Sequence, residues 1–161
     1  MALGDFIILE QNSMTARGAR LYNVAAAATT INAGEPVTRA LGGVTVTAMA
    51  TNKPVVGTDY LAGIAMTTST QTASVAGTVN VMPLSSGITY LVSPTAPTSW
   101  DTQAEYDALV GKRVLIDLTT GSYTILASDS ANNGCVIMPL DIAKYPGKVA
   151  FCFRQAVSDV Q

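Results

Sequence analysis

Few of the side chains in this sequence are of types that commonly do chemistry, and histidine is missing altogether. Without histidine, neither a Ser–His–Asp nor a Cys–His catalytic set can form, and the commonest metal ligand is lost. Two cysteines cannot make a four-ligand zinc site, and the carboxylates are scattered singly, with no obvious pair for glycoside hydrolysis. A Ser–Lys dyad stays open, although no pattern points to one. The sequence therefore predicts a protein that is not an enzyme and needs no metal or cofactor.

Two aspartates and two cysteines each allow a second interpretation. Asp117 and Asp129 resemble metal ligands, but hairpin shoulders and turns use aspartate for backbone hydrogen bonds far more often. Cys135 and Cys152 fall in apolar, strand-like runs, where we expect small buried hydrophobic side chains. A disulfide between them is possible if their strands are neighbours, although a cytosolic product would keep both thiols reduced.

The aromatic residues give a weak indication of a carbohydrate site. A sugar-binding set would draw on Tyr60, Tyr90, Trp100, Tyr106, Tyr123 and Tyr145. These residues are spread over separate predicted elements, which is more typical of ordinary half-buried aromatics.

The chain has 161 residues, long enough for one domain with a real core, and only 12% of them are charged. With so few charged residues, much of the surface must be uncharged, which suits permanent burial against other subunits. A weakly charged extracellular monomer would look similar. The net charge of −2 gives no basic field for nucleic acid or an anionic membrane, and no apolar run approaches the roughly 20 residues of a membrane span. Phe6–Leu9 is too short for a signal core, so we expect a protein made and used without secretion.

The elements that position these residues are predicted to be short β-strands. The central stretch, Val55–Val92, places β-branched residues among small or polar ones and turns at glycines or Ser/Thr clusters. Leu21–Thr30 contains four consecutive alanines and is predicted to be a closely packed strand, with a short helix as the alternative. Val114–Leu118 and Tyr123–Leu126 flank a glycine-containing loop and predict a hairpin. Together these patterns predict an all-β fold, either a small β-barrel or a sandwich.

One short helix and one linker interrupt the predicted strands. Thr102 and Glu105 have the spacing of a capping box, and Gly111 stands where a helix commonly ends, so we predict a helix over Gln103–Val110. The segment before it carries two prolines among small polar residues. Two possible lobes of sheet would then be joined near residues 93–99.

Residues 1–20 are predicted to form an extended N-terminal arm, and residues 21–161 the β-rich domain. The arm begins apolar, becomes polar, and keeps neither a helical nor an alternating pattern for long. The alternative is a first edge strand of the domain itself, and both interpretations place its apolar cluster against an apolar surface. The residues expected to contact a partner are Phe6, Ile7, Ile8 and Leu9 by burial, with Arg17 and Arg20 at the rim.

Three short motifs occur between Ile31 and Val92. A glycine-containing turn precedes a strand at Ala33–Val37, an Ala–Gly–Ile–Ala segment lies within Leu61–Ala65, and a Gly–Thr–Val strand lies within Ala76–Val81. This pattern resembles the small capsid decoration proteins, or cement proteins, of tailed bacteriophages.

The resemblance implies a tulip-like β-barrel that binds the outer surface of a phage head as a homotrimer. Such a structural virion protein would clamp neighbouring major capsid protein subunits, would be made in the host cytoplasm, and would need no nucleic acid, membrane or small-molecule substrate. Few charges, strand edges and an apolar arm suit this role independently. The competing class is a minor head or tail protein with a receptor- or sugar-binding role, and an unrecognised enzyme is a further alternative.

Overall fold

The computed structural model of the chain describes residues 7–11, 18–27, 29–40, 43–84, 88–96, 100–119, 122–126 and 128–157, with 7–11 and 119 described by backbone alone. Strands hold 43% of the described residues and helices 6%, so the predicted all-β fold is confirmed. The short helix α1, Gln103–Asp107, carries the predicted capping box, in which the Glu105 N–H donates to Thr102 Oγ1 at 3.3 Å. The helix ends at Asp107 instead of the predicted Val110, and a turn continues the chain.

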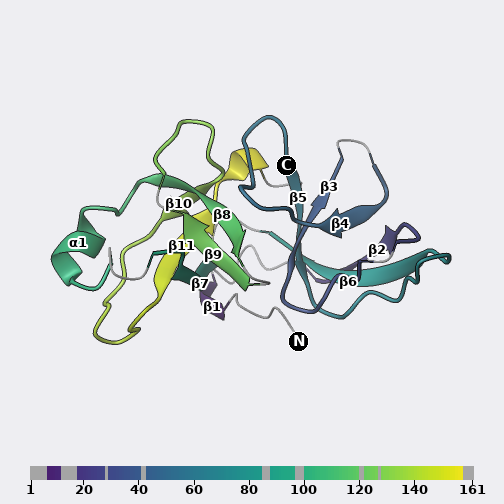
Figure 1. Cartoon of the computed structure of the whole chain (residues 1–161), viewed down its shortest axis with the longest axis horizontal. Helices are drawn as coiled ribbons and strands as arrows, with labels where there is room; N and C mark the ends of the chain where they lie inside the picture. Colours follow the sequence, from purple (N-terminus) through teal and green to yellow (C-terminus); the bar gives the residue numbers. More distant parts are fainter. Residues whose placement is uncertain are drawn as a thin grey trace.

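The described strands form two sheets, each curled round a hydrophobic core of its own (Figure 1). The part built on β2 to β6 is the first lobe, and the part built on β1 and β7 to β11 is the second lobe. The strands are β1 (Ile7–Gln11), β2 (Arg20–Val24), β3 (Pro36–Arg39), β4 (Val46–Ala48), β5 (Tyr60–Ala65), β6 (Gly77–Pro83), β7 (Ile88–Pro94), β8 (Arg113–Thr119), β9 (Ser122–Leu126), β10 (Cys135–Ile137) and β11 (Val149–Phe153).

The first lobe is a five-stranded sheet with strand order β2-β6-β5-β3-β4. Its side chains alternate between core and solvent, as in β6, where Val79 and Val81 are buried and Asn80 between them is exposed. A single bridge between Asn23 and Thr45 brings the outer strands β2 and β4 together, so the sheet curls back on itself. Its buried core consists of valine, alanine and isoleucine side chains.

The second lobe has strand order β1-β7-β11-β10-β8-β9, and a parallel pairing of β7 with β9 closes the last five strands into a barrel. β1 lies outside this ring, antiparallel to β7. Aromatic rings fill the barrel: the Tyr90 ring centroid lies 5.7 Å from that of Phe151 and 5.4 Å from that of Phe153. Tilted and edge-on contacts of this kind are favoured between aromatic rings.

Strand β5 is shared by the two cores because it is buried on both faces. Leu61 and Ile64 pack into the core of the second lobe, whereas Ala62 and Ala65 pack into the core of the first. A bulge in the β3–β5 pairing inserts one extra residue into β5. The alternation of side chains therefore restarts after the bulge, and Ile64 and Ala65 face the same two cores as Leu61 and Ala62. β5 is therefore the common wall of the two lobes.

A crossing segment, residues 49–59, runs from the first lobe onto the second lobe. Met49 is buried in the core of the second lobe, and its carbonyl oxygen accepts a hydrogen bond of 2.9 Å from the Tyr123 hydroxyl. Lys53 exchanges two backbone hydrogen bonds with Ile116 of β8, of 3.1 and 2.7 Å. The two lobes are therefore joined by packing and by hydrogen bonds as well as by the chain.

The described part of the segment 93–99, predicted to join two lobes, lies within the second lobe. The chain between the two lobes has already reached the second lobe's core at Leu84. Ser93 and Pro94 belong to the end of β7, where they pair in parallel with β9, and residues 97–99 lie outside the described residues. A proline fits there because the end of a strand needs no ladder hydrogen bond from its nitrogen.

The two cysteines lie on neighbouring strands but point to opposite faces. β10 and β11 pair antiparallel, with Cys135 opposite Phe153 and Cys152 opposite Val136. Because side chains alternate along a strand, the buried Cys135 points into the barrel and the half-buried Cys152 points outward. Both thiols are free, and burial raises the pKa of each.

Candidate functional site

The two aspartates that resembled metal ligands hold backbone and hydroxyl groups in place. Asp117 accepts a hydrogen bond from Thr51 Oγ1, and Asp129 Oδ1 accepts from the Arg113 backbone N–H at 3.1 Å. That backbone hydrogen bond is the main cause of the lowered pKa of Asp129, with the Arg113 guanidinium contributing at 3.4 Å. Within the described ranges, no three histidine, cysteine or acidic side chains lie close enough together to hold a metal ion.

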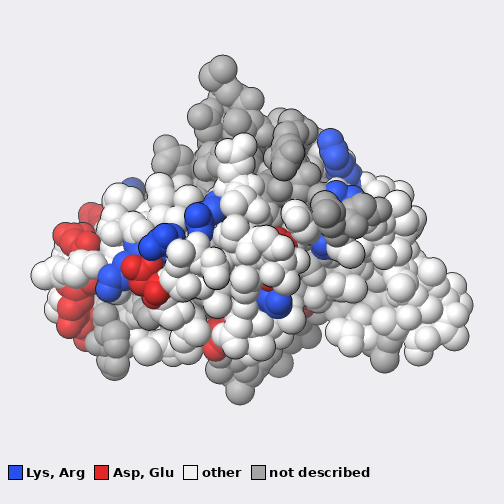
Figure 2. Space-filling view, turned by 90° about the horizontal axis from the view of Figure 1, so that it is seen from above, with Lys and Arg blue, Asp and Glu red and all other residues white. Residues whose placement is uncertain are grey.

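The first lobe presents a surface with very few charges. The sequence has no acidic or basic residue between Asp59 and Asp101, a run that includes β5 and β6. Glu35 is only 3% exposed, and its carboxylate accepts hydrogen bonds from the backbone and side-chain nitrogens of Asn32. Figure 2 shows the far end of the first lobe, on the right, almost entirely white, whereas red and blue atoms gather over the second lobe. Docking on this end would desolvate hardly any charge.

Three outward side chains, Leu21, Asn80 and Met66, form a row across this surface, called here the outer row. Leu21 of β2 lies opposite Asn80 of β6, and the Met66 N–H, just after β5, donates to the Asn80 carbonyl oxygen at 2.7 Å. Leu21 is 67% exposed and Met66 is 48% exposed. Two large apolar side chains therefore face solvent on either side of a neutral amide.

The outer row meets a mostly apolar hollow of about 250 Å³ at the junction of the lobes, called here the junction hollow. Its lining residues are Ala33, Gly34, Ile64, Ala65, Met66, Met82 and Tyr90. Met66 belongs to both features, and unbranched methionines adapt readily to an irregular partner. Burial raises the pKa of Tyr90 far above its usual range, so its hydroxyl adds no charge. The outer row and the junction hollow together form an uncharged face.

The structure places only part of the six predicted contact residues. Phe6 and Arg17 lie outside the described residues. Ile7, Ile8 and Leu9 belong to β1. The backbone of β1 pairs with β7, and this register puts Ile8 opposite Tyr90. Arg20, the first residue of β2, is exposed and immediately precedes Leu21 of the outer row. β1 is thus an edge strand of the domain, the alternative that the sequence left open, and it pairs with the strand that carries Tyr90.

Sequence reasoning missed the residues of the outer row and the junction hollow. The uncharged run between Asp59 and Asp101 was a usable signal. The sequence could not predict which apolar residues of this run face solvent. β5 is buried on both faces, so its residues show no simple alternation of apolar and polar types.

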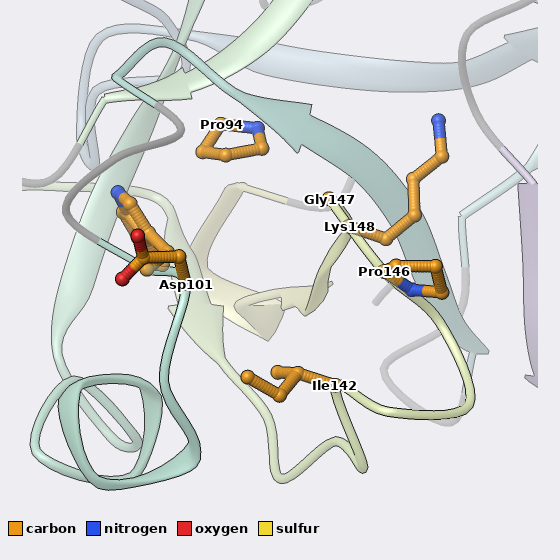
Figure 3. A pocket seen from close by; sticks show the side chains of 7 residues that line it. Pro94, Asp101, Ile142, Pro146, Gly147 and Lys148 are labelled. Carbon is orange, nitrogen blue, oxygen red and sulfur yellow. The ribbon is translucent and has the colours of Figure 1, made fainter.

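The opposite end of the molecule carries a second hollow, of about 270 Å³ (Figure 3). Its rim is lined by Pro94, Trp100, Asp101, Ile142, Pro146, Gly147 and Lys148. Only 5% of the Trp100 surface is exposed, and the Lys148 ammonium donates to Ser93 Oγ at 3.3 Å. This rim hollow therefore combines apolar walls with the exposed carboxylate of Asp101 and the ammonium of Lys148.

Three of the aromatic residues considered for a sugar site, Tyr90, Tyr106 and Tyr123, are core residues at 1% exposure or less. The Tyr106 hydroxyl donates to the Met138 carbonyl oxygen at 2.8 Å and accepts from the Ala150 N–H at 2.9 Å. Burial raises the pKa of Tyr106 to about 12. These side chains stabilise the second lobe and offer no stacking surface for a sugar.

Among the described residues, no helix has the length and apolar character needed to cross a membrane. Comparisons of the chain with protein-family models, with curated proteins and with solved structures find no significant match.

Proposed function

We propose that this chain is a structural virion protein that binds the outer surface of a phage head and clamps neighbouring major capsid subunits. The observation that carries the proposal is the uncharged face of the first lobe. Exposed Leu21 and Met66 beside an apolar hollow are the kind of patch that marks a protein–protein contact. The sequence motifs that resemble phage decoration proteins point to the capsid as the partner.

Burial of this face would provide useful binding energy at little electrostatic cost. A fully buried leucine or methionine side chain contributes roughly 1.5–3 kcal/mol relative to an exposed one. A charge that is buried on docking must be paired to offset its desolvation. The run that contains β5 and β6 has no charged residue, so these strands need no such pairing. A strong contact is therefore available without a matching charge pattern on the capsid.

The proposal includes a homotrimer, because a clamp gains avidity when several copies grip several capsid subunits at once. β1 supports this architecture, since it is the end strand of its sheet and turns one edge away from β7. Such an edge can accept a strand from a capsid subunit or from another copy. No catalytic step is part of the proposed role.

A variant of the uncharged face tests the proposal. The double change Leu21→Asp and Met66→Asp puts two charges on the outer row without touching either core. We expect it to weaken binding to empty capsids that lack the protein by at least about tenfold. Leu118→Asp is the matched control, because Leu118 is an exposed leucine (36%) of the second lobe. Equal binding by both variants would contradict the proposed contact.

The rim hollow favours a second candidate function, that of a minor head or tail protein which binds a receptor or sugar. Apolar walls with the Asp101 carboxylate and the Lys148 ammonium are suited to a small neutral ring whose hydroxyl groups donate and accept hydrogen bonds. Trp100 is the chain's single tryptophan, so all tryptophan fluorescence comes from one residue that lines this hollow. A saturable fluorescence change with a panel of monosaccharides, lost in Asp101→Asn, would favour this candidate over the capsid clamp.

A further inference from the structure

Asn133 and Gly134 are the chain's one Asn-Gly pair, and they immediately precede β10. Asparagine is a thermolabile residue, and a following glycine makes it most reactive, because the backbone nitrogen can then approach the side chain freely. In the folded chain Asn133 is only 4% exposed and Gly134 is buried. The most reactive asparagine context in the sequence is thus enclosed by the fold.

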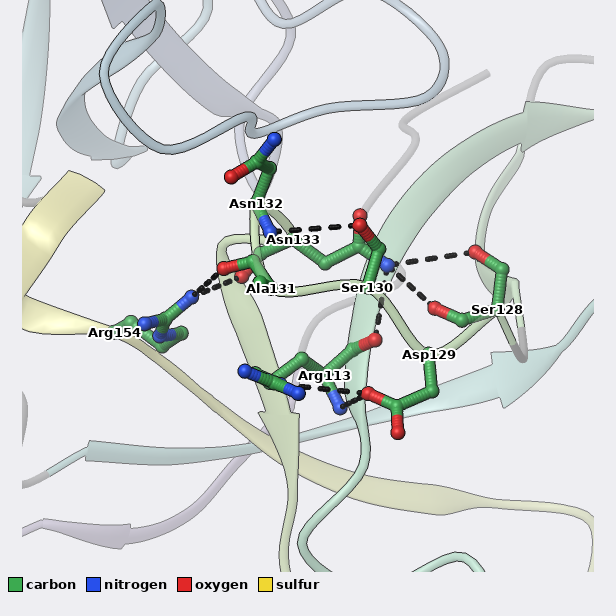
Figure 4. A network of polar contacts seen from close by, with 8 residues as sticks. All are labelled: Arg113, Ser128, Asp129, Ser130, Ala131, Asn132, Asn133 and Arg154. Atoms are coloured by element: carbon green, nitrogen blue, oxygen red, sulfur yellow. Dashed lines mark hydrogen bonds and ion pairs between the residues drawn. The ribbon is translucent and has the colours of Figure 1, made fainter.

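The Asn133 side chain is held by hydrogen bonds to Arg113 and Ser128 (Figure 4). Its Nδ2 donates to the Arg113 carbonyl oxygen at 2.9 Å and also to the Ser128 carbonyl oxygen. Arg154 Nη1 donates to the Asn133 carbonyl oxygen at 2.8 Å. The side chain and the backbone of Asn133 are therefore both fixed.

The nitrogen that would attack this amide is occupied by the crossing segment. The Gly134 N–H donates to the Pro54 carbonyl oxygen at 2.9 Å, and the Val56 N–H donates to the Asn132 carbonyl oxygen at 2.7 Å. The segment packs so closely that a Cβ on Gly134 would lie 2.6 Å from two atoms of Pro54. Cyclisation therefore requires the segment to leave first.

We propose that Asn133-Gly134 is a latent deamidation site which the crossing segment keeps unreactive. When the segment opens, the Gly134 nitrogen loses its proton and attacks Asn133 Cγ; the Cγ–Nδ2 bond breaks, and ammonia leaves with that proton. Water then opens the cyclic imide at either carbonyl, giving aspartate or isoaspartate. The new carboxylate has no hydrogen to donate to the Arg113 and Ser128 carbonyl oxygens, so an opened chain that reacts loses its native contacts for good.

The first test compares the full chain in native buffer with the full chain in concentrated urea, with deamidation at Asn133 followed by mass spectrometry of its peptides. We expect the native rate to be at least about a hundredfold lower, because the reaction is confined to rare openings. Equal rates in the two conditions would overturn the proposal.

The second test loosens the crossing segment. Asp59 anchors it through an ion pair of 3.0 Å to Lys53 and a hydrogen bond of 2.8 Å from the Val55 N–H. Asp59→Ala is expected to raise the native rate about tenfold, while Asp107→Ala, which removes an exposed acid of α1, leaves it unchanged. Circular dichroism checks that the variant is folded, and Lys53→Ala replaces it if it is not. A folded variant with the wild-type rate would contradict the gating by this segment.

The third test concerns the product. Asn133→Asp reproduces the deamidated side chain and is expected to lower the melting temperature clearly. Asn132→Asp, one residue earlier and exposed, is the matched control and is expected to melt like the wild type. If both variants melt at the same temperature, the native contacts tolerate the product, and the claim of an irreversible loss is wrong.

Discussion

Tyr106 shows at the scale of one residue how this chain uses its polar groups. Its hydroxyl accepts from the Ala150 N–H and donates to the Met138 carbonyl oxygen, so one side-chain atom ties α1 to β11 and to the segment after β10. Burial without a full set of partners costs free energy, and here both roles of the hydroxyl are filled. The Tyr106 side chain therefore stabilises the second lobe by linking these elements.

Tyr106→Phe is expected to destabilise the protein by about 1–3 kcal/mol, because the backbone groups of Met138 and Ala150 lose this partner. The pKa of Tyr106 rises from 10.0 to about 12, so ionisation is harder in the folded state than in the unfolded state. Its contribution is therefore complete below pH 10 and is lost as the pH rises through about 12. Urea unfolding of both proteins across this window measures the difference, which should shrink toward high pH. A constant difference would contradict this assignment.

Gly63→Ala is expected to cost at least about 3 kcal/mol or to prevent folding. At Gly63 φ is +153°, and a Cβ would lie 1.9 Å from the Met82 carbonyl oxygen, so β5 and β6 would have to separate. Gly111→Ala is the control, because φ there is +84° but nothing lies within 4 Å of an added Cβ, and strain alone costs about 1–2 kcal/mol. Denaturant unfolding compares the two, and equal losses would refute the close approach at β5.

At the scale of elements, the local patterns were predictable and their combination was not. The hairpin of β8 and β9 and the capping box of α1 follow from turn and cap residues that act over a few positions. Leu21–Thr30 is strand only as far as Val24, because Leu21 to Val24 pair with β6 and residues 25–27 do not continue that ladder. Closure of β7 on β9 depends on long-range pairing, which no local pattern specifies.

The uncharged face shows the same limit of local reasoning. Leu21 and Asn80 lie 59 positions apart and meet only through the β2–β6 register. The junction hollow needs Tyr90 of β7 in the second lobe beside Ala33, which lies 57 positions earlier in the first lobe. The sequence could indicate that its surface is poor in charge, but the location of an apolar patch requires the fold.

Deletion of residues 1–11 is expected to leave the protein folded, because β1 lies outside the ring that the β7–β9 pairing closes. Capsid binding should fall severely, since the edge strand and its apolar cluster are proposed contacts. Far-ultraviolet circular dichroism checks the fold and co-sedimentation with capsids checks the binding. A truncated chain that binds as well as the full chain would remove β1 from the contact, and one that cannot fold would make β1 an integral strand.

At the scale of the whole molecule, two small lobes behave as one body because β5 is a shared wall and the crossing segment is docked on β8. We expect a single unfolding transition in urea. Trp100 fluorescence reports on the second lobe and far-ultraviolet circular dichroism on the whole chain, so the two curves should coincide. Separate midpoints would show that the lobes unfold independently.

The central claim is that the chain clamps a capsid shell, and its binding to empty phage capsids that lack it tests this most directly. The proposal predicts saturable binding with three copies at each local threefold site, together with a higher melting temperature of the shell. Absence of saturable binding would contradict the claim outright. Bound copies that leave the stability of the shell unchanged would contradict the clamp and would favour a receptor- or sugar-binding role.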